Sequence, residues 1–264
     1  MTGIIMDEHA YAQKRIDSKD LGDKPREAVI CVIKYYRDKG FNRQDTRAAT
    51  LDFIQSVDRR IDIHQWEATV DRYLRRNWKT PTVRIQSIPI TQDELDKVRA
   101  LPSERMRRLL FSLICYAKFA DMSAGTRHGW INRQYRQIFQ NGNVHISVDE
   151  QCDMIRRLKE MGLISTTKKI GNLNIKVECI DWDGEPVINV TNLQNTGYQY
   201  SATERPLMYK QCESCGMYIK KQSGNSRVRR CEKCAKNTLA AWERNRYLRS
   251  KNTSGVSPEN YASS

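Results

Sequence analysis

The chain has 264 residues, and its 45 Lys and Arg exceed its 31 Asp and Glu, which gives a formal net charge of +14. Apolar residues of the set AVILMFWYC make up 39% of the chain, enough for packed cores, so a fully disordered protein is excluded. No run of 18 apolar residues occurs, which excludes a transmembrane helix, and because residues 1–10 are largely polar we expect no secretory signal. The positive charge favours a polyanionic partner, with nucleic acid ahead of a membrane surface, although many basic proteins bind no polyanion.

The first part of the chain is predicted to be helical. Residues 1–24 are expected to be loosely ordered, with one short helix at most. In residues 25–80, apolar side chains recur at spacings of three and four, which is typical of amphipathic helices. Each helix would bury one face, so we expect a small bundle. The three predicted helices run from Pro25 to about Gly40, from Gln44 to Val57 and from His64 to Trp78.

A second domain is predicted over residues 91–200, after a linker or short strand at 81–90. Thr91 and Glu94 have the spacing of a capping box at the start of a helix. Ser103 should cap a longer helix that ends near Met122. The broad apolar face of this helix makes it the best candidate for a core element; the face consists of Met106, Leu109, Leu110, Leu113, Ile114 and Ala117.

The elements that follow the long helix have the order of a winged helix-turn-helix. We expect a short helix from Trp130 to Phe139, a turn at 141–143, and a helix that Ser147 caps and Gly162 ends. Two strands, Leu163–Lys168 and Leu173–Ile180, would then form a hairpin. The prediction depends on element order and turn chemistry, because no single residue is diagnostic of this fold.

The charges of this centre leave its role open. In a winged helix the early residues of the second helix face the DNA, but here they include Asp149, Glu150 and Asp153. Carboxylates at that position oppose phosphate binding. Either the end of the helix and the wing contact a nucleic-acid backbone, or the module is structural or binds protein. The basic residues available to the first alternative are Arg156, Arg157, Lys159, Lys168, Lys169 and Lys176.

Four of the eight cysteines stand alone among apolar residues, and we expect them to be buried thiols. The other four form one cluster. Lone cysteines together with one cluster favour a reducing cytoplasm over a disulfide scaffold. The lone cysteines are Cys31, Cys115, Cys152 and Cys179.

The cluster has the spacing C-x2-C-x15-C-x2-C, which is typical of a zinc site. Each C-x-x-C directs two sulfur atoms to one point, and two such turns supply four ligands at tetrahedral angles. We therefore predict a zinc ribbon with one structural Zn²⁺ per chain, although iron can occupy the same ligand set. Strands Met217–Lys221 and Arg227–Arg230 would form its hairpin. The predicted ligands are Cys212, Cys215, Cys231 and Cys234.

The cluster lies in a strongly basic segment, residues 205–251. This segment contains 13 Lys and Arg and 3 Glu, a net charge of +10, and a helix follows its last cysteine pair. Basic side chains neutralise phosphates and aromatic rings stack on bases, so we expect this segment to bind nucleic acid, with DNA favoured over RNA. Alternatively, its aromatic residues only pack on the ribbon. The predicted contacts are Lys220, Lys221, Arg227, Arg229, Arg230, Lys236, Trp242, Arg244, Arg246 and Arg249, with Lys168 and Lys169 of the wing. Residues 252–264 are expected to be a disordered tail.

Patterns that indicate an enzyme are missing from the sequence. The four histidines share no metal-ligand spacing, and no phosphate-binding glycine loop, Gly-x-Ser-x-Gly turn or His-Glu-x-x-His motif occurs. Asp181 and Asp183 belong to the segment DWDGEP, where turn chemistry explains them. We therefore expect a protein that is not an enzyme.

Several segments resemble a family of uncharacterised proteins from phages and integrated elements of Gram-positive bacteria. They include REAVICVIKYYRDKGF, LLFSLICYAKF, GLISTTKKIGNLNIKV and CESCGMYIKK…RRCEKCAKN, and the resemblance covers roughly residues 25–236. It implies a phage context and the cytoplasm of a bacterial host, but no activity. Residues 26–77 are also similar to the helical module that follows some replication primases, without the primase catalytic acids.

Together these patterns predict an α+β, mostly α protein with an N-terminal helical bundle, a winged-helix-like centre and a C-terminal zinc ribbon. Its predicted function is that of a nucleic-acid-binding accessory protein of phage replication or transcription. The alternative is a phage-encoded inhibitor or regulator that docks on a host polymerase or defence complex.

Overall fold

The computed structural model describes residues 4–22, 24–58, 60–131, 135–167, 174–221, 228–236, 238–239, 243 and 246. This part of the chain is α+β and mostly helical with small sheets, which confirms the predicted fold class at this level. The chain divides into two compact units, Met1–Thr196 and Gly197–Ser264. The finer division into five segments stays a prediction. Among the helices of the described residues, none has the length and apolar character that crossing a bilayer requires.

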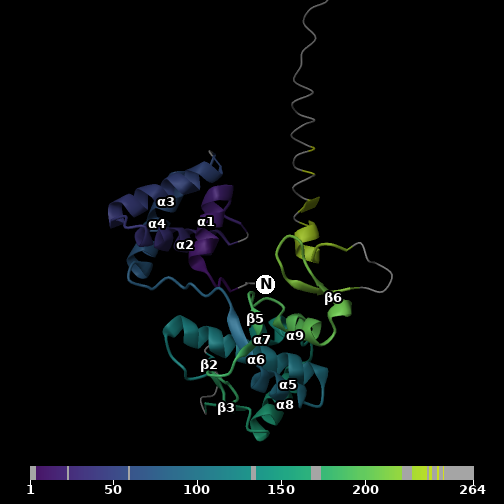
Figure 1. The fold of residues 1–264 in the computed structure, drawn as a ribbon. Coiled ribbons are helices and arrows are strands. Elements are labelled where there is room, and N and C mark those ends of the chain that lie inside the picture. Colours follow the sequence, from purple (N-terminus) through teal and green to yellow (C-terminus); the bar gives the residue numbers. More distant parts are fainter. Residues whose placement is uncertain are drawn as a thin grey trace, which may run out of the picture. The chain divides into compact units, whose positions relative to one another are not determined.

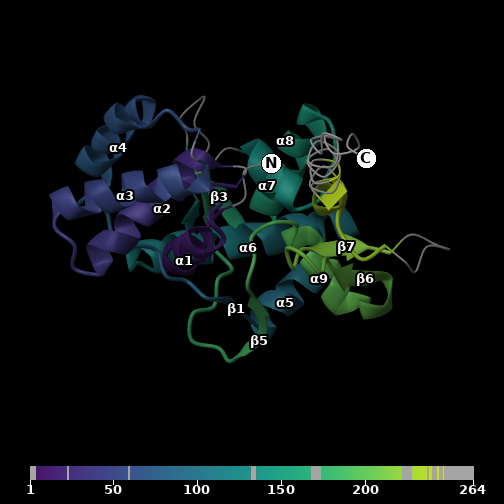
Figure 2. The same cartoon turned by 90° about the horizontal axis from the view of Figure 1, so that it is seen from above.

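Four helices at the N-terminus share one core. They are α1 (Glu8–Ser18), α2 (Pro25–Asp38), α3 (Arg43–Val57) and α4 (Ile63–Asn77), and both ribbon views show them gathered together (Figures 1 and 2). The last three match the predicted helices to within a few residues, and α1 lies in the segment expected to hold one short helix at most. The fully buried residues of their core include Ala12, Val29, Val32, Ile33, Ile54 and Val70.

A buried ion pair ties α1 to α2 and to the segment after α4. The Lys34 ammonium lies 2.7 Å from the Glu8 carboxylate, and both side chains are largely buried. Glu8 also accepts a hydrogen bond from the backbone N–H of Val83 at 2.8 Å, and Lys34 donates to the carbonyl of Pro81 at 3.2 Å. Because each charge has more than one partner, the pair holds α1 against the bundle without leaving a charge unsatisfied.

The centre of the first unit has two small sheets and four helices. Strand β1 (Ile88–Thr91) pairs antiparallel with β5 (Pro186–Val190), with Ile88 opposite Val190. The second sheet has the order β2-β4-β3. Its strands are β2 (Trp130–Ile131), β3 (Ile164–Thr166) and β4 (Ile175–Val177), and the helices are α5 (Gln92–Arg99), α6 (Glu104–Ala124), α7 (Tyr135–Asn141) and α8 (Val148–Glu160).

Helix α6 is the central core element, as predicted. Leu110 and Leu113 are fully buried, and so is the rest of the predicted apolar face. Ser103 caps the helix by accepting from the backbone N–H of Met106, and Gly125 ends it in the left-handed conformation. The predicted capping boxes of α5 (Thr91 with Glu94) and α8 (Ser147 with Glu150) are both present.

Glu94 and Lys118 form an ion pair inside this centre. The Lys118 ammonium lies 2.8 Å from the Glu94 carboxylate and donates to the carbonyl of Pro89 at 2.8 Å. Both side chains are almost completely buried. Glu94 also accepts from the backbone N–H groups of Thr91 at 2.9 Å and Asp181 at 3.0 Å. One carboxylate thus joins α5, α6, the end of β1 and the turn before β5.

The predicted helix Trp130–Phe139 is wrong at its start. Trp130 and Ile131 form strand β2, which pairs with β4, and helix α7 begins only at Tyr135. The turn into β2 depends on Gly129, which has φ of +73° and whose added Cβ would lie 2.6 Å from the Val177 carbonyl oxygen. A strand of two residues leaves no periodic pattern, so helical spacing misassigned it.

The second unit contains short elements around the cysteines. Helix α9 (Thr196–Glu204) starts at the boundary between the units and leads to the 3-10 helix η1 (Pro206–Met208), β6 (Tyr209–Gln211) and β7 (Tyr218–Lys220). The strands pair antiparallel, with Tyr209 opposite Lys220. The predicted pairing of 217–221 with 227–230 is therefore wrong for β7, because its partner precedes the first cysteine pair. Residues 228–230 form no strand.

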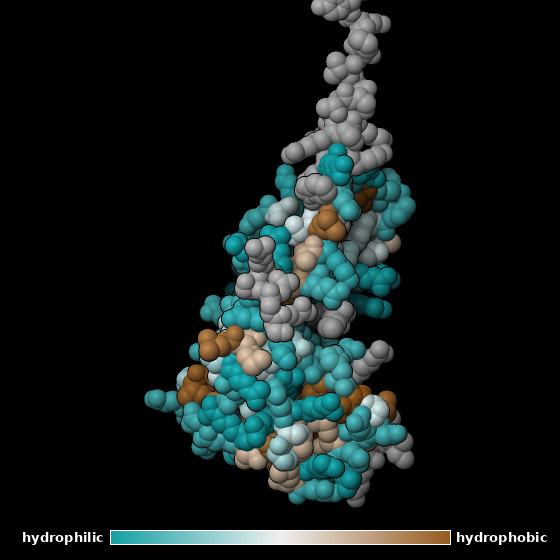
Figure 3. Space-filling view, turned by 90° about the vertical axis from the view of Figure 1, so that its right-hand side faces the viewer, coloured by the Kyte–Doolittle hydropathy of each residue, from teal (hydrophilic) through white to brown (hydrophobic). Residues whose placement is uncertain are grey.

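Three of the four lone cysteines are buried as predicted, but Cys152 is exposed on α8. The prediction failed there because the apolar neighbours of Cys152 do not imply its own burial: in α8 Ile155 and Leu158 are buried, whereas Cys152 is exposed. Large exposed apolar residues are few among the described residues, and the most exposed are Leu207 at 86% and Val148 at 72%. The face in Figure 3 correspondingly shows hydrophobic side chains in small groups among hydrophilic ones.

The burial of α6 predicts the cost of shortening its side chains. Leu110→Ala and Leu113→Ala should each lower the free energy of unfolding by about 2–5 kcal/mol, because each leaves a cavity in a packed core. Chemical denaturation would measure the loss. Met122→Ala in the same helix is the control, since Met122 is 38% exposed and should change stability by less than about 1 kcal/mol. Equal, small losses for all three variants would contradict the packing of α6.

The pair of Glu94 and Lys118 predicts a second, larger effect. Lys118→Met should destabilise the protein by about 3–5 kcal/mol, because it leaves the Glu94 carboxylate buried without its counter-charge. The double variant Glu94→Gln/Lys118→Met should recover part of that loss, since it removes both charges. Thermal or urea unfolding of the two variants measures the difference. A double variant less stable than Lys118→Met would show that the charge of Glu94 is not the cause.

Candidate metal centre and nucleic-acid interface

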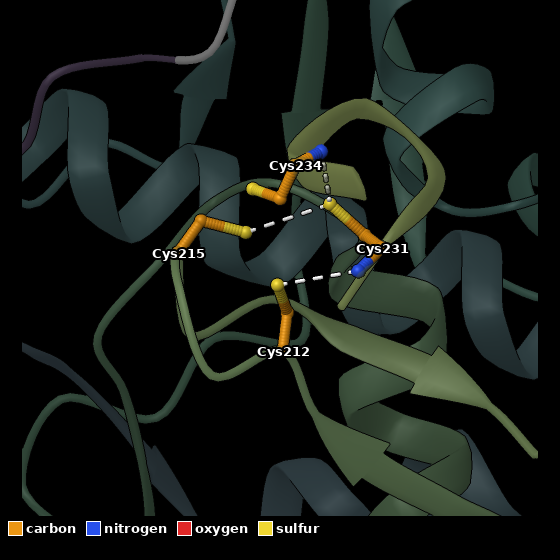
Figure 4. Close-up of side chains that lie close together, drawn as sticks. All are labelled: Cys212, Cys215, Cys231 and Cys234. Carbon is orange, nitrogen blue, oxygen red and sulfur yellow. Dashed lines mark hydrogen bonds between the residues drawn. The ribbon is translucent and has the colours of Figure 1, made fainter. Parts of the chain in front are cut away.

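Four cysteines converge in the second unit, as the sequence predicted. The sulfur atoms of Cys212, Cys215, Cys231 and Cys234 all lie within 4.8 Å of one another, and Figure 4 shows them turned toward a common centre. Cys212 follows β6 directly, and Cys215 precedes β7. Cys231 and Cys234 lie at the start of the helical residues 232–236. Within the described part of the chain, this is the only cluster of at least three His, Cys, Asp or Glu side chains that could hold a metal ion.

The first cysteine pair lies in the loop of the β6–β7 hairpin. The backbone N–H of Cys212 donates to the carbonyl of Met217, and the N–H of Gly216 donates to the carbonyl of Cys212, both at 2.8 Å. Gly216 has φ of +71°, a conformation that glycine adopts without strain. The turn is therefore closed by its own backbone, with the side chains of Cys212 and Cys215 on the side of the cluster.

The second cysteine pair begins a helical turn, and its backbone contacts the sulfur atoms. The N–H of Cys231 lies 3.2 Å from Sγ of Cys212, and the N–H of Cys234 lies 3.4 Å from Sγ of Cys231 (Figure 4). Sγ of Cys215 lies 3.8 Å from Sγ of Cys231. Hydrogen bonds from N–H groups to sulfur stabilise the thiolate, which is the form that binds metal.

These contacts give Cys212 and Cys215 different acidities. Burial opposes ionisation of Cys212, but the N–H groups of Cys231, Ser214 and Cys215 outweigh it and lower the pKa of Cys212 to about 6. Burial and the neighbouring Cys212 raise the pKa of Cys215 to about 11. A thiolate at Cys212 thus opposes ionisation of Cys215, as expected of like charges a few ångströms apart. A divalent cation at the centre reverses that repulsion, so the donor set fits a metal ion.

The predicted basic contacts that lie in the described part of this unit are exposed. Lys220 and Lys221 end and follow β7, and among the described residues no carboxylate lies within ion-pair distance of either. Arg229 has only a distant partner, Glu213 at 3.7 Å. Arg230 donates to the Thr238 hydroxyl at 2.9 Å, and Lys236 pairs with Glu232 at 2.6 Å. Arg246 is also exposed.

Six of the predicted contacts lie outside the described residues: Arg227, Trp242, Arg244, Arg249, Lys168 and Lys169.

Of the basic residues of α8 and β4, Arg156 and Lys176 are paired with carboxylates, whereas Arg157 and Lys159 are exposed and form no ion pair among the described residues. Arg156 contacts Asp153 at 3.2 Å and Glu160 at 3.0 Å, so two carboxylates surround one guanidinium. Lys176 pairs with Glu178 at 2.6 Å. These pairs reduce the positive charge available on the described part of the predicted recognition helix and wing to that of Arg157 and Lys159.

The sequence prediction missed strand β6, which forms half of the hairpin that carries the first cysteine pair. The segment is only three residues long and follows Pro206, so its pattern is weak. Burial changes steadily from buried Tyr209 to exposed Gln211, so the strand has no alternation that the sequence could have shown.

Comparisons with protein-family models, with curated proteins and with solved structures found no match to this chain. The resemblance to phage proteins therefore stays a prediction from the sequence segments that carry it.

The cluster predicts a stoichiometric metal. Purified under reducing conditions, the protein should contain about one zinc ion per chain, because four thiolates at this spacing form one tetrahedral site. Cys231→Ser should lose the metal and the hydrogen-exchange protection of β6 and β7, while α6 in the other unit keeps its protection. Cys152→Ser is the matched control, since Cys152 is exposed and outside the cluster. Folded, reduced protein without metal would contradict the site.

Proposed function

We propose that this protein is a non-enzymatic nucleic-acid-binding accessory protein, acting in phage replication or transcription in the cytoplasm of a bacterial host. The observation that carries the proposal is the set of exposed basic side chains around the four-cysteine cluster. Lys220, Lys221 and Arg229 lie in the segments that the cysteines join; Lys220 and Lys221 have no ion pair among the described residues, and Arg229 lies 3.7 Å from the Glu213 carboxylate. Such side chains are available to phosphates.

The proposed metal is a structural Zn²⁺. Four thiolates favour a soft ion, and a site closed by four protein ligands has no open position for a substrate. The ion with four thiolates carries a formal charge of −2, so the +10 of residues 205–251 becomes about +8 and the segment remains strongly basic. The metal would thus fix the segments that carry the basic side chains without cancelling their positive charge. Iron in the same ligand set is the alternative that elemental analysis decides.

DNA binding through the phosphate backbone fits this surface better than base recognition. Long Lys and Arg side chains on short strands and turns reach phosphates from many orientations. Aromatic stacking on single strands would need Trp242, which lies outside the described residues. We favour DNA over RNA, and the binding experiment below compares the two.

We also propose that the centre of the first unit is a winged helix-turn-helix. The order α6, β2, α7, α8, β3, β4, with the sheet order β2-β4-β3, supports this interpretation. Because Arg156 and Lys176 are neutralised and α8 begins with carboxylates, we propose a structural or protein-binding role for this module.

The second candidate function follows from the surface of helix α8. A protein-binding regulator that docks on a host polymerase or defence complex could use α8, where Val148 is 72% and Met161 51% exposed beside acidic residues. In that case the protein alone would not bind DNA, and its partner would carry a basic surface. The salt dependence of DNA binding separates the two functions.

The test is a salt titration of duplex DNA binding by the full chain. The triple variant Lys220→Gln/Lys221→Gln/Arg229→Gln should bind more weakly and with a log–log salt slope reduced by about 3, because each phosphate contact on duplex DNA contributes about −0.9. Fluorescence anisotropy with DNA and RNA duplexes of equal length measures both quantities.

The control for this experiment is Lys14→Gln/Lys19→Gln/Arg26→Gln, which removes three exposed charges from the other unit. It should leave the slope nearly unchanged. If the full chain fails to bind DNA or RNA even at low salt, the protein-binding alternative replaces the proposal.

A further inference from the structure

The outer face of helix α4 has a row of cations. Arg75 and Arg76 follow Arg72 by three and four residues, and Lys79 follows them by four and three, so the four lie on one side of the helix and its C-terminal extension. All four are exposed. The buried residues Val70, Tyr73 and Leu74 lie on the opposite side, against the core that α4 shares with α1, α2 and α3.

Carboxylates are kept away from this row. The acidic residues of α4, Glu67 and Asp71, lie on the side of the helix that faces α3, where both contact Arg47 at 3.1 and 2.7 Å. Among the described residues, no carboxylate lies within ion-pair distance of Arg72, Arg75, Arg76 or Lys79. The acids of α4 thus neutralise a cation of α3, and the cations of the outer face stay uncompensated.

The carbonyl groups at the C-terminal end of α4 do not need this row of cations as hydrogen-bond donors. The last carbonyl groups of an α-helix lack intrahelical partners and often use nearby basic side chains. Here the side chain of Asn77 donates to the Tyr73 carbonyl at 2.9 Å, and the backbone N–H groups of Trp78 and Thr80 donate to the carbonyls of Leu74 and Asn77, both at 3.1 Å. Attraction to the helix dipole falls off within the last turn, so it does not account for Arg72.

The row continues beyond α4 to the start of α3. The guanidinium of Arg43 lies over the Trp78 ring, 5.7 Å from its centroid, and is exposed on its other side. Neighbouring positions on the outer face of α4 are polar or small: Gln65, Ala68 and Thr69. A helix that binds a membrane surface carries large apolar side chains to insert, and this face has none.

We propose that this α4 surface, defined by Arg72, Arg75, Arg76, Lys79 and Arg43, is a second nucleic-acid contact that binds the phosphate backbone of duplex DNA without reading its sequence. From Arg72 to Lys79 the row is about 10 Å long at 1.5 Å per residue. Duplex DNA presents one negative charge per about 1.7 Å of its axis, so several phosphates lie within reach of the four side chains. The inference goes beyond the proposed function, because it places binding on the other compact unit and on different residues.

The test uses the full chain with Arg72→Gln/Arg75→Gln/Arg76→Gln. Gln keeps helix propensity and removes only the charges, and circular dichroism with thermal unfolding verifies that the bundle remains folded. On a duplex of about 30 base pairs, the log–log salt slope should fall by about 3, and the loss should be equal for unrelated DNA sequences. The control Lys14→Gln/Lys19→Gln/Arg26→Gln removes the same number of charges from α1 and α2 and should not change the slope.

A combination of variants distinguishes this inference from the proposed function. If both surfaces bind, the Lys220/Lys221/Arg229 variant and the α4 variant should lower the log–log salt slope independently. A protein that carries both sets of substitutions should then show the sum of the two reductions. An unchanged slope in the α4 variant, with a reduced slope in the Lys220/Lys221/Arg229 variant, would overturn the inference and leave the proposed function standing. The reverse pattern would overturn the location given to binding in the proposed function. Vesicles of anionic phospholipid should not bind wild type more tightly than the α4 variant; a preference would overturn the assignment to DNA.

Discussion

The buried pair of Glu94 and Lys118 is the constraint on which the centre of the first unit depends. A charge in a core is costly unless it is paired and hydrogen-bonded, and here both conditions are met. Lys118 contacts Glu94 and the Pro89 carbonyl, and Glu94 accepts from the backbone of Thr91 and Asp181. These partners come from four separate segments, so satisfying two charges fixes β1, α5, α6 and the approach to β5 relative to one another. Because α6 is fixed in this way, β2 and α7 pack on a defined surface.

The second unit has to be held together differently. It contains strands of three residues and a short helix, and few of its described side chains are fully buried. Such a small region rarely gains enough from hydrophobic burial to fold, and a metal commonly provides the missing stability. The four-cysteine cluster is therefore the central structural element of this unit, as helix α6 is of the first unit. The proposed metal would also let exposed cations gather there, since a frame held by a metal tolerates their mutual repulsion better than a weak core does.

Local signals in the sequence predicted the helices well, because caps and spacings are local. Thr91, Ser103 and Ser147 mark their helices with side chains that bond to backbone three residues away. The spacing of the cysteines likewise predicted the cluster, since each pair is a local turn. Local signals could not predict pairings between distant segments. Almost a hundred residues separate β1 from its partner β5, and strands β2 and β6 are too short to show alternation. Nothing near Glu94 in the sequence indicates that Lys118 is its partner.

The distribution of ion pairs, more than the net charge, indicates where a polyanion would bind. Net charge is a property of the whole chain, whereas binding depends on cations that have no carboxylate beside them. In α8, Arg156 lies between the carboxylates of Asp153 and Glu160, and two further acids occupy the first turn. In α4 the two acids contact Arg47 of α3, and the cations of the outer face have no ion pair among the described residues. Helix α8 contains four acidic residues against three basic ones, whereas α4 contains two against three, so the two helices differ in net charge and in where their acids lie. This is why the α4 surface, which composition alone did not single out, is a better candidate for phosphate contact than the predicted recognition helix.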